Sequence, residues 1–224
     1  MTFSLVGRCA RTGMVGVVVT SSSPAVAARC AWARASVGAV STQNITDPTL
    51  APKILDLLAA GASAQAALDT VVSGAEHAAY RQLTVVDATG RTASFSGEHT
   101  LGRHGTAEGK DCLAAGNLLA YDDVPTAMVR AFEQHPNEHL ALRLLAALRA
   151  GDDAGGEEGP VHSCGVLVFD HVSWATTDLR VDWSKDPIGD LEEAWRVWSP
   201  QEVDYVNRAL DPSAAPSYGV PGDE

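Results

Sequence analysis

The chain has 224 residues, of which 46% are hydrophobic and 20% charged, and this composition is typical of a globular protein with a sizeable core. The net charge of −12 argues against nucleic acid and against an anionic membrane surface as partners, because both are bound through basic patches. The sequence has neither a secretory signal at its start nor an apolar run of about eighteen residues, so we expect a cytoplasmic protein without a membrane span. Cys9, Cys30, Cys112 and Cys164 are scattered and are expected to be reduced and mostly buried.

The first half of the chain predicts strands, then a pair of helices, then a hairpin. Alternating or β-branched apolar residues predict the strands, and Gly13 ends the first turn. Asp47 and Pro48 are a suitable N-cap and first helical residue. Gly61 ends that helix, and Ser63 caps the next. The predicted elements are strands at residues 3–8, 15–21 and 36–43, helices at 48–61 and 63–73, and hairpin strands at 80–86 and 91–96.

The second half continues after a polar, Gly-rich loop at residues 98–111, which is long enough to suggest a function. An acidic, Gly-rich loop at 151–159 separates two further helices from a late hairpin. Another short helix begins near Pro200, and the chain ends in a tail. The predicted elements are helices at residues 122–134 and 137–150, hairpin strands at 162–169 and 173–181, and a helix at 188–198.

Strand pairs joined by tight turns indicate antiparallel sheets rather than a doubly wound parallel sheet. Two such sheets packed face to face, with a pair of helices on each outer face, bury the apolar faces of all these elements. We therefore expect an α+β fold, a four-layer αββα sandwich formed by one domain over residues 1–198. Residues 199–224 are expected to add a short helix and a tail.

Several segments between Thr2 and about Leu191 carry a family resemblance: MTFSLV, TGMVGVVVTS, WARASVGAVSTQ, ILDLLAAG, YRQLTVVDATGR, FSGE, AGNLL and DLRVDWSKDPIGDL. Together they resemble the bacterial domain of unknown function 1028 proteins, which are described as similar to N-terminal nucleophile (Ntn) hydrolases. The resemblance implies the αββα sandwich and a fold that commonly self-associates, so a homo-oligomer is expected. It implies little about a substrate. The run from Ser22 to Pro24 and the tail after Trp198 depart from the family pattern.

Thr2 is the candidate nucleophile. Removal of Met1 leaves a threonine whose hydroxyl lies beside its own α-amine. An α-amine has a pKa of about 7.7–8.0, which suits a base at neutral pH. Attack by the hydroxyl on a carbonyl and release of the acyl group by water would complete hydrolysis. The alternative is a polar residue at the start of a strand, with Met1 retained.

Ser21 is the candidate that orients the nucleophile. It ends the second strand, which a short turn pairs with the first, so it is expected close to Thr2. Ser21 matches the serine of the family at this position, whereas Ser22 and Ser23 do not. The alternative is the start of a Ser-rich loop.

Four further residues are candidates for substrate binding. Gln43 and Asn44 follow the third strand, where backbone N–H groups and an amide side chain could stabilise an oxyanion. Asn117, in AGNLL, could do the same or bind polar groups of the substrate; alternatively it is a left-handed turn residue after Gly116. Arg34 could pair with a substrate carboxylate, or it is a surface cation or part of an internal salt bridge.

Neither the histidines nor the glycine-rich segments complete a metal or phosphate site. His135 and His139 have i, i+4 spacing, but the segment is not the H-E-x-x-H of zinc enzymes. His99 and His104 lie among acidic residues in the polar loop, where a metal is possible but loop polarity is the simpler explanation. GTAEG lacks the lysine and the strand-to-helix frame of a phosphate-binding loop. We therefore expect neither a metal nor a cofactor.

These features favour a cofactor-independent hydrolase of the Ntn type that acts on an amide or related C–N bond in a small metabolite. Thr2 would be both nucleophile and base. The alternatives are a non-catalytic Ntn-like binding or assembly protein, and a hydrolase that uses an internal residue such as Ser21 or Cys30. The aromatic segment around Trp195 and Trp198 is either an interface between subunits or part of the core.

Overall fold

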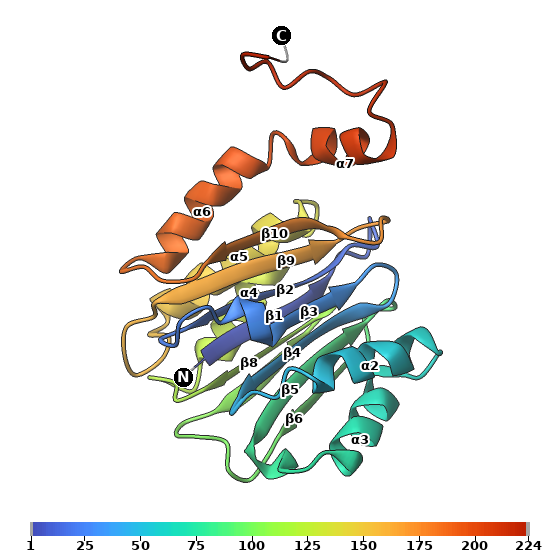
Figure 1. The fold of residues 1–224 in the computed structure, drawn as a ribbon. Helices are drawn as coiled ribbons and strands as arrows, with labels where there is room; N and C mark the ends of the chain where they lie inside the picture. Colours follow the sequence, from blue (N-terminus) through green and yellow to red (C-terminus); the bar gives the residue numbers. More distant parts are fainter. Residues whose placement is uncertain (1, 223–224) are drawn as a thin grey trace.

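The computed structural model describes residues 2–222 as two antiparallel sheets packed face to face, with helices on both outer faces (Figure 1). One sheet has six strands in the order β10-β9-β2-β1-β8-β7, and the other has four in the order β3-β4-β5-β6. The strands are β1 Thr2–Arg8, β2 Val15–Ser21, β3 Ala31–Arg34, β4 Gly38–Asn44, β5 Arg81–Asp87, β6 Thr92–Ser96, β7 Gly105–Gly109, β8 Cys112–Asn117, β9 Ser163–Phe169 and β10 Ala175–Val181. The helices are α1 Ala27–Cys30, α2 Leu50–Ala59, α3 Ala64–Gly74, the 3₁₀ turn η1 Ala78–Tyr80, α4 Val124–Gln134, α5 Leu140–Asp153, α6 Pro187–Trp198 and α7 Glu202–Leu210. The predicted α+β sandwich is confirmed.

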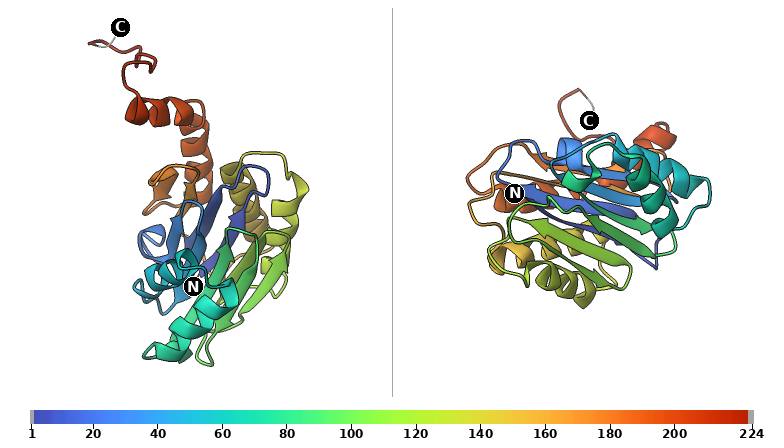
Figure 2. Two further views of the ribbon diagram at one scale, coloured as in Figure 1. Left: turned by 90° about the vertical axis from the view of Figure 1, so that its right-hand side faces the viewer. Right: turned by 90° about the horizontal axis from the view of Figure 1, so that it is seen from below.

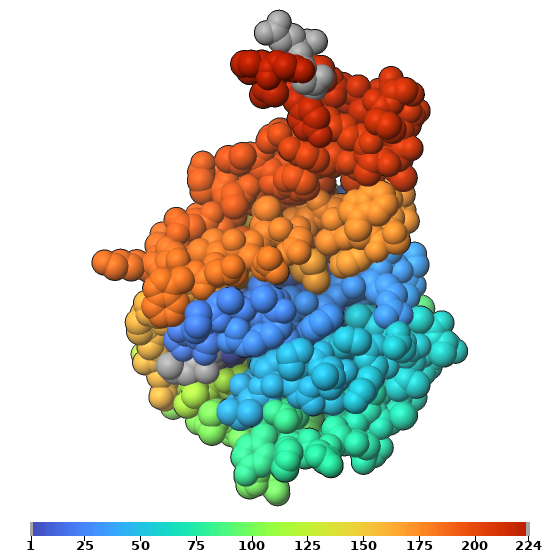
Figure 3. All heavy atoms as spheres, viewed as in Figure 1, coloured from blue at the N-terminus to red at the C-terminus, as the bar shows by residue number. Residues whose placement is uncertain are grey.

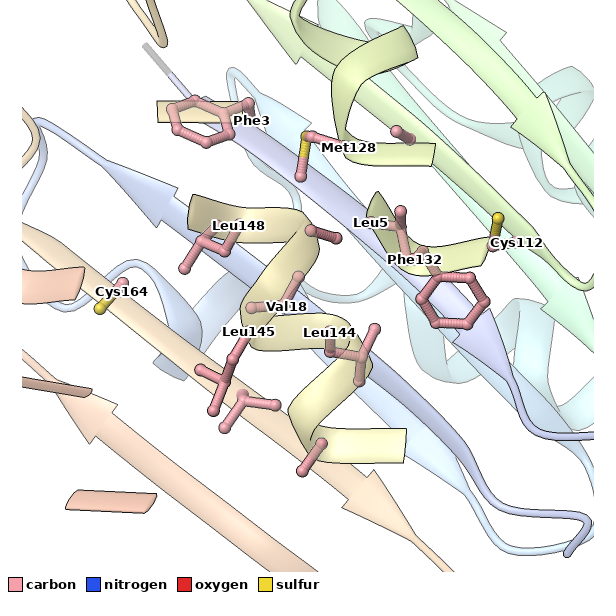
Figure 4. Packing of buried hydrophobic residues seen from close by; sticks show 14 of the residues in the cluster. Phe3, Leu5, Val18, Cys112, Met128, Phe132, Leu144, Leu145, Leu148 and Cys164 are labelled. Carbon is pink, nitrogen blue, oxygen red and sulfur yellow. The ribbon is translucent and has the colours of Figure 1, made fainter. Parts of the chain in front are cut away.

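Strand β1 lies inside the six-stranded sheet, between β2 and β8, and its side chains alternate between two environments. Phe3 and Leu5 point outward and pack against apolar side chains of α4 and α5 (Figure 4). Ser4 and Val6 point the other way, toward the four-stranded sheet. Burial of each large apolar side chain stabilises the fold by roughly 1.5–3 kcal/mol. The first residues of the chain that the structure describes are therefore fixed in the centre of the molecule.

Helices α2 and α3 cover the outer face of the four-stranded sheet. Ile54 and Leu68 of these helices form a second core with Val40 and Val85 of the strands beneath. The predicted cap of α3 is confirmed, because the Ser63 hydroxyl accepts a hydrogen bond at its first turn.

The start of α2 differs from the prediction. The helix begins at Leu50, with Thr49 at the cap position, and Asp47 is not its N-cap. Asp47 Oδ1 instead accepts from the backbone N–H and the hydroxyl of Thr49, at 3.0 and 2.8 Å. Asp47 thus closes a local turn before the helix, an alternative that aspartate side chains readily provide.

Two strand pairs are more extensive than predicted. Residues 22–35 lie between the strands predicted at 15–21 and 36–43, but they contain α1 and the edge strand β3, and β4 begins at Gly38. The polar loop predicted at residues 98–111 contains β7, which pairs with β8 as an antiparallel hairpin. Strands β3 and β7 lie at sheet edges, are short and keep many half-exposed small or polar residues. Pairing with a neighbouring strand, rather than β propensity, holds such segments extended.

The carboxyl-terminal helices lie outside the sandwich. Helix α6 packs against the six-stranded sheet. Helix α7 begins against β10, where Glu202 accepts a hydrogen bond from the Thr177 hydroxyl at 2.7 Å, and the tail projects away from the body (Figures 2 and 3). Trp195 is buried and stacks on His139, and Trp198 donates to the Thr176 carbonyl at 3.2 Å, so both tryptophans pack within the chain. All four cysteines are buried and free, as predicted. Within residues 2–222, every helix is too short or too polar to cross a bilayer.

Candidate active site

The space between the two sheets is apolar at one end and polar at the other. Apolar side chains fill the first end: Val6, Val15, Val17, Ala39, Val86 and Leu113. The same strands carry buried hydroxyl and amide side chains at the second end: Thr2, Ser4, Ser21, Ser41, Gln43, Gln82 and Asn117. We call this second set the polar end. Buried polar groups are unfavourable unless they are hydrogen-bonded, so a cluster of them marks a candidate active site.

Thr2 opens β1 at the polar end. Its hydroxyl donates to the Ser21 hydroxyl at 3.3 Å. On the other side of β1, Thr2 lies directly opposite Asn117 of β8. Ser21 is held in turn, because its carbonyl accepts from the His162 N–H at 2.8 Å. Met1 lies outside the described residues, so its predicted removal stays a prediction.

Gln82 is the centre of a buried amide network beside Thr2. Its Oε1 accepts from Gln43 Nε2 at 2.8 Å and from Asn117 Nδ2 at 3.1 Å. Its Nε2 donates to the Gly116 carbonyl at 3.1 Å. Gln43 Oε1 accepts from the Ser4 hydroxyl at 2.6 Å, which connects the network to β1. These bonds fix the orientation of each amide and hold Asn117 in place. Sequence reasoning did not single out Gln82, because a glutamine within a strand pattern carries no local sign of this role.

Asn117 retains hydrogen-bonding capacity opposite Thr2. An amide NH₂ group has two N–H donors, and the contact with Gln82 uses one of them. Its Oδ1 is buried and has no hydrogen-bond partner among residues 2–222. A buried polar atom without a partner is uncommon in folded proteins and is consistent with a ligand contact. The structure thus brings Thr2, Ser21, Gln43 and Asn117 to one end of the sandwich.

Glu157 is a second buried group at this end that sequence reasoning missed. It is 4% exposed, and neither carboxylate oxygen has a hydrogen-bond partner within the described part of the chain. Burial raises the pKa of Glu157 to about 7. Ser22 lies close to this carboxyl without forming a hydrogen bond of regular geometry, and it offsets part of the rise. In the sequence, Glu157 is one acid among several in GDDAGGEEGP, and nothing local distinguishes it from a solvated one.

The structure does not bring the other two predicted binding residues into this network. Asn44 has a φ of +71°, and its Nδ2 donates to the Tyr80 carbonyl at 2.7 Å, so its amide ties neighbouring loops together. Arg34 lies opposite Gly38, at the far end of the β3–β4 pair. There it forms a surface ion pair with Asp56 at 2.8 Å.

Cys30 is poorly suited to act as a nucleophile. Burial raises the pKa of its thiol, so the reactive thiolate is scarce at neutral pH. Two cavities of about 460 and 470 Å³ lie elsewhere, one against α4, α5 and α6 and the other beside the β1–β2 turn. Among residues 2–222, their linings contain no serine, threonine or cysteine. The polar end therefore offers the better chemistry.

Comparison with known proteins places the chain in a family. The model of the family of unknown function DUF1028 matches residues 2–191, which include every residue of the polar end. Protein SPO2555 from Silicibacter pomeroyi, a DUF1028 crystal structure, aligns with a TM-score of 0.81 and 28% identity, over 88% of this chain and 88% of that chain. Anbu (ancestral beta-subunit) from Yersinia bercovieri aligns over 89% of this chain and 95% of its own with a TM-score of 0.36 and 8% identity, values too low to indicate a shared fold. No curated protein matches the chain.

Proposed function

This chain belongs to the DUF1028 family, and from its site we propose that it is a cofactor-independent hydrolase of an amide or related C–N bond in a small metabolite. The observation that carries the proposal is the position of Thr2. The second residue of the chain has its hydroxyl at a buried polar end, 3.3 Å from Ser21 and opposite Asn117 in the strand register. A threonine one peptide bond from the chain start needs only the loss of Met1 to acquire an adjacent amine base.

The proposed reaction is acyl transfer through Thr2. Its hydroxyl attacks the carbonyl carbon and passes its proton to its own α-amine. The remaining N–H of Asn117 is a donor for the oxyanion that forms. When the C–N bond breaks, the leaving nitrogen takes the proton from the α-ammonium, and water then hydrolyses the Thr2 ester. Ser21 accepts from the Thr2 hydroxyl and thereby limits its rotamers.

The test starts with the intact mass of the protein, made without an amino-terminal tag in a bacterial cytoplasm. We expect a mass without Met1. Purified wild type, Thr2→Ala and Thr2→Ser are then assayed against a library of small amides. Thr12→Ala is the matched control, because Thr12 is exposed in the turn at the far end of β1.

We expect turnover by wild type and by Thr12→Ala, reduced turnover by Thr2→Ser, and none by Thr2→Ala. Full retention of Met1, or turnover by Thr2→Ala at the wild-type rate, would overturn the proposed mechanism. An amino-terminal nucleophile needs both the hydroxyl and the free α-amine of Thr2. Retained Met1 would leave no free α-amine on Thr2, and an active Thr2→Ala variant would show that the hydroxyl is not required.

A non-catalytic binding or assembly protein is the second candidate. Exposed apolar side chains on α7 and the tail favour it, since Val203, Leu210 and Tyr218 are 67%, 58% and 51% exposed. This candidate predicts no turnover by wild type and a change in oligomeric state when residues 199–224 are deleted. Size-exclusion chromatography with light scattering measures that change.

A further inference from the structure

Glu157 lies directly beyond the amino-terminal end of β1. Thr2 is the first residue of β1 and pairs with Asn117 of β8. Two residues farther along the chain from Asn117, Leu119 forms an antiparallel bridge with Glu157. Two backbone hydrogen bonds flank this bridge, from Ala120 N to Gly156 O at 3.0 Å and from Glu158 N to Leu118 O at 2.9 Å. The segment that carries Glu157 therefore lies along the same edge of β8 as β1, and only the position opposite Leu118 separates Thr2 from Glu157 in the register.

Two contacts show that this segment reaches β1 and β2. A β-carbon added at Gly156 would lie 3.3 Å from the ring of Phe3, so the segment touches the start of β1. Ser22 lies near enough to influence the carboxyl of Glu157, and it follows the serine that Thr2 contacts. Glu157 is thus enclosed by the chain that follows β8 and the chain that follows β2, the two strands that pair with β1.

The hydroxyl and N–H of Ser22 approach the carboxylate and lower its pKa, but neither forms a hydrogen bond of regular geometry with it. Both of its oxygens are buried without a hydrogen-bond partner among residues 2–222. Such a group is retained in folded proteins when another group completes its hydrogen bonds. An α-ammonium at Thr2 is suited to this role, because it carries positive charge and three N–H donors at the end of β1. We infer that Glu157 accepts a hydrogen bond from the α-amino group of Thr2 and positions that group as the base.

This inference rests on the proposed function for the role of the amine and adds the residue that holds it. As the bond between Thr2 Oγ1 and the substrate carbon forms, the α-amine takes the hydroxyl proton and becomes an ammonium. A carboxylate against it stabilises that charge, as the buried aspartate stabilises the imidazolium in a Ser-His-Asp triad. The ammonium then gives the proton to the leaving nitrogen. Glu157 touches neither substrate nor reacting atoms, so it is a positioning residue.

Burial and the neighbouring charges together set the pKa of Glu157. Burial and, to a smaller extent, the negative charge of Asp152 raise the pKa of Glu157. Contact with an ammonium acts in the opposite direction on this carboxyl and raises the pKa of the amine. Glu158, the next residue, is exposed and provides a matched control of the same charge.

The test titrates the α-amine itself and needs no substrate. The full chain from Thr2 is released from a cleavable fusion as wild type, Glu157→Gln, Glu157→Asp and Glu158→Gln. The rate at which an acylating reagent modifies the α-amine is measured against pH by mass spectrometry of the amino-terminal peptide. We expect Glu157→Gln to lower the amine pKa by about one unit and Glu158→Gln to leave it unchanged, with Glu157→Asp between them. The same amine titration in wild type and Glu157→Gln would falsify the inference.

A second measurement leaves Glu157 intact, in case its variants do not fold. The pKa of the Glu157 carboxyl is followed by ¹³C nuclear magnetic resonance in the chain from Thr2, with its α-amine free or acetylated. Acetylation removes the ammonium, so the carboxyl pKa should rise, and an unchanged value overturns the contact. Neither readout depends on hydrolysis. If Thr2→Ala is active and Glu157→Gln shifts the amine pKa, only the proposed function is rejected. If Thr2→Ala is inactive and Glu157→Gln leaves the amine pKa unshifted, only the Glu157 contact is rejected.

Discussion

The Thr2 hydroxyl donates to the Ser21 hydroxyl across 3.3 Å, and this contact joins the first residue of β1 to the last residue of β2. Ser21 Oγ also accepts from the Ser23 N–H at 3.1 Å, so the acceptor is held by the loop that follows it. The direction of the candidate nucleophile is therefore set by two paired strand ends.

Replacement of Ser21 by alanine tests this orientation. We expect Ser21→Ala to lower kcat/KM about tenfold or more, because the Thr2 hydroxyl gains rotamers that do not face the substrate. The free energy of unfolding should fall by about 1 kcal/mol, from the loss of the contacts with Thr2 and Ser23. Steady-state kinetics and urea denaturation measure the two effects. Ser173→Ala, at an exposed position, is the control. An unchanged kcat/KM in Ser21→Ala contradicts the orienting role.

Replacement of Gln82 by leucine tests the amide network. The change leaves the Nε2 of Gln43 and the Nδ2 of Asn117 without their shared acceptor. We expect a loss of about 3 kcal/mol in the free energy of unfolding, because buried donors would remain unsatisfied. Gln65→Leu, on the exposed face of α3, should change stability by less than about 0.5 kcal/mol. Equal urea midpoints for the two variants would exclude a structural network at the polar end.

The raised pKa of Glu157 predicts a pH dependence of stability. An acid whose pKa rises from 4.5 to about 7 on folding binds more protons in the folded state, so stability falls as pH increases through that window. The difference corresponds to at most about 3 kcal/mol, and contact with an ammonium reduces it. Glu157→Gln lacks this titration. With the α-amine acetylated, so that no ammonium faces the carboxyl, we expect the variant to equal wild type near pH 4 and to be more stable than wild type at pH 8, as measured by thermal unfolding across the range. Parallel pH profiles of the two proteins would contradict a buried, raised carboxyl.

Arg34 provides a prediction of no effect. Its ion pair with Asp56 joins side chains that are 44% and 69% exposed, at the opposite end of the β3–β4 pair from Gln43. Exposed pairs of this kind contribute less than about 1 kcal/mol. We expect Arg34→Ala to retain kcat/KM and nearly all stability, in parallel with Asp56→Asn. A rise in KM confined to Arg34→Ala would restore the expected role of Arg34 in binding a substrate carboxylate.

Local patterns in the sequence determined most of the layered architecture. The β-branched run of β2 and the apolar faces of α2 and α5 predict their structures because each pattern has a period that matches its own element. The position of Thr2 at the start of a strand was equally visible. Strands β3 and β7 were not, because their small and polar residues carry no period and are held extended by neighbours distant in the chain.

The composition of the polar end was decided by the tertiary structure. Thr2, Asn117 and Gln82 meet only because antiparallel register and sheet packing bring β1, β8 and β5 together, and register is a property of pairs of strands. Glu157 is a buried acid because a loop with the composition of a solvent-exposed segment folds over the end of β1. Burial of a charge depends on what surrounds it, and those surroundings come from segments up to about 150 residues away along the chain. The sequence alone thus determined the candidate nucleophile, and only the fold decided which groups surround it.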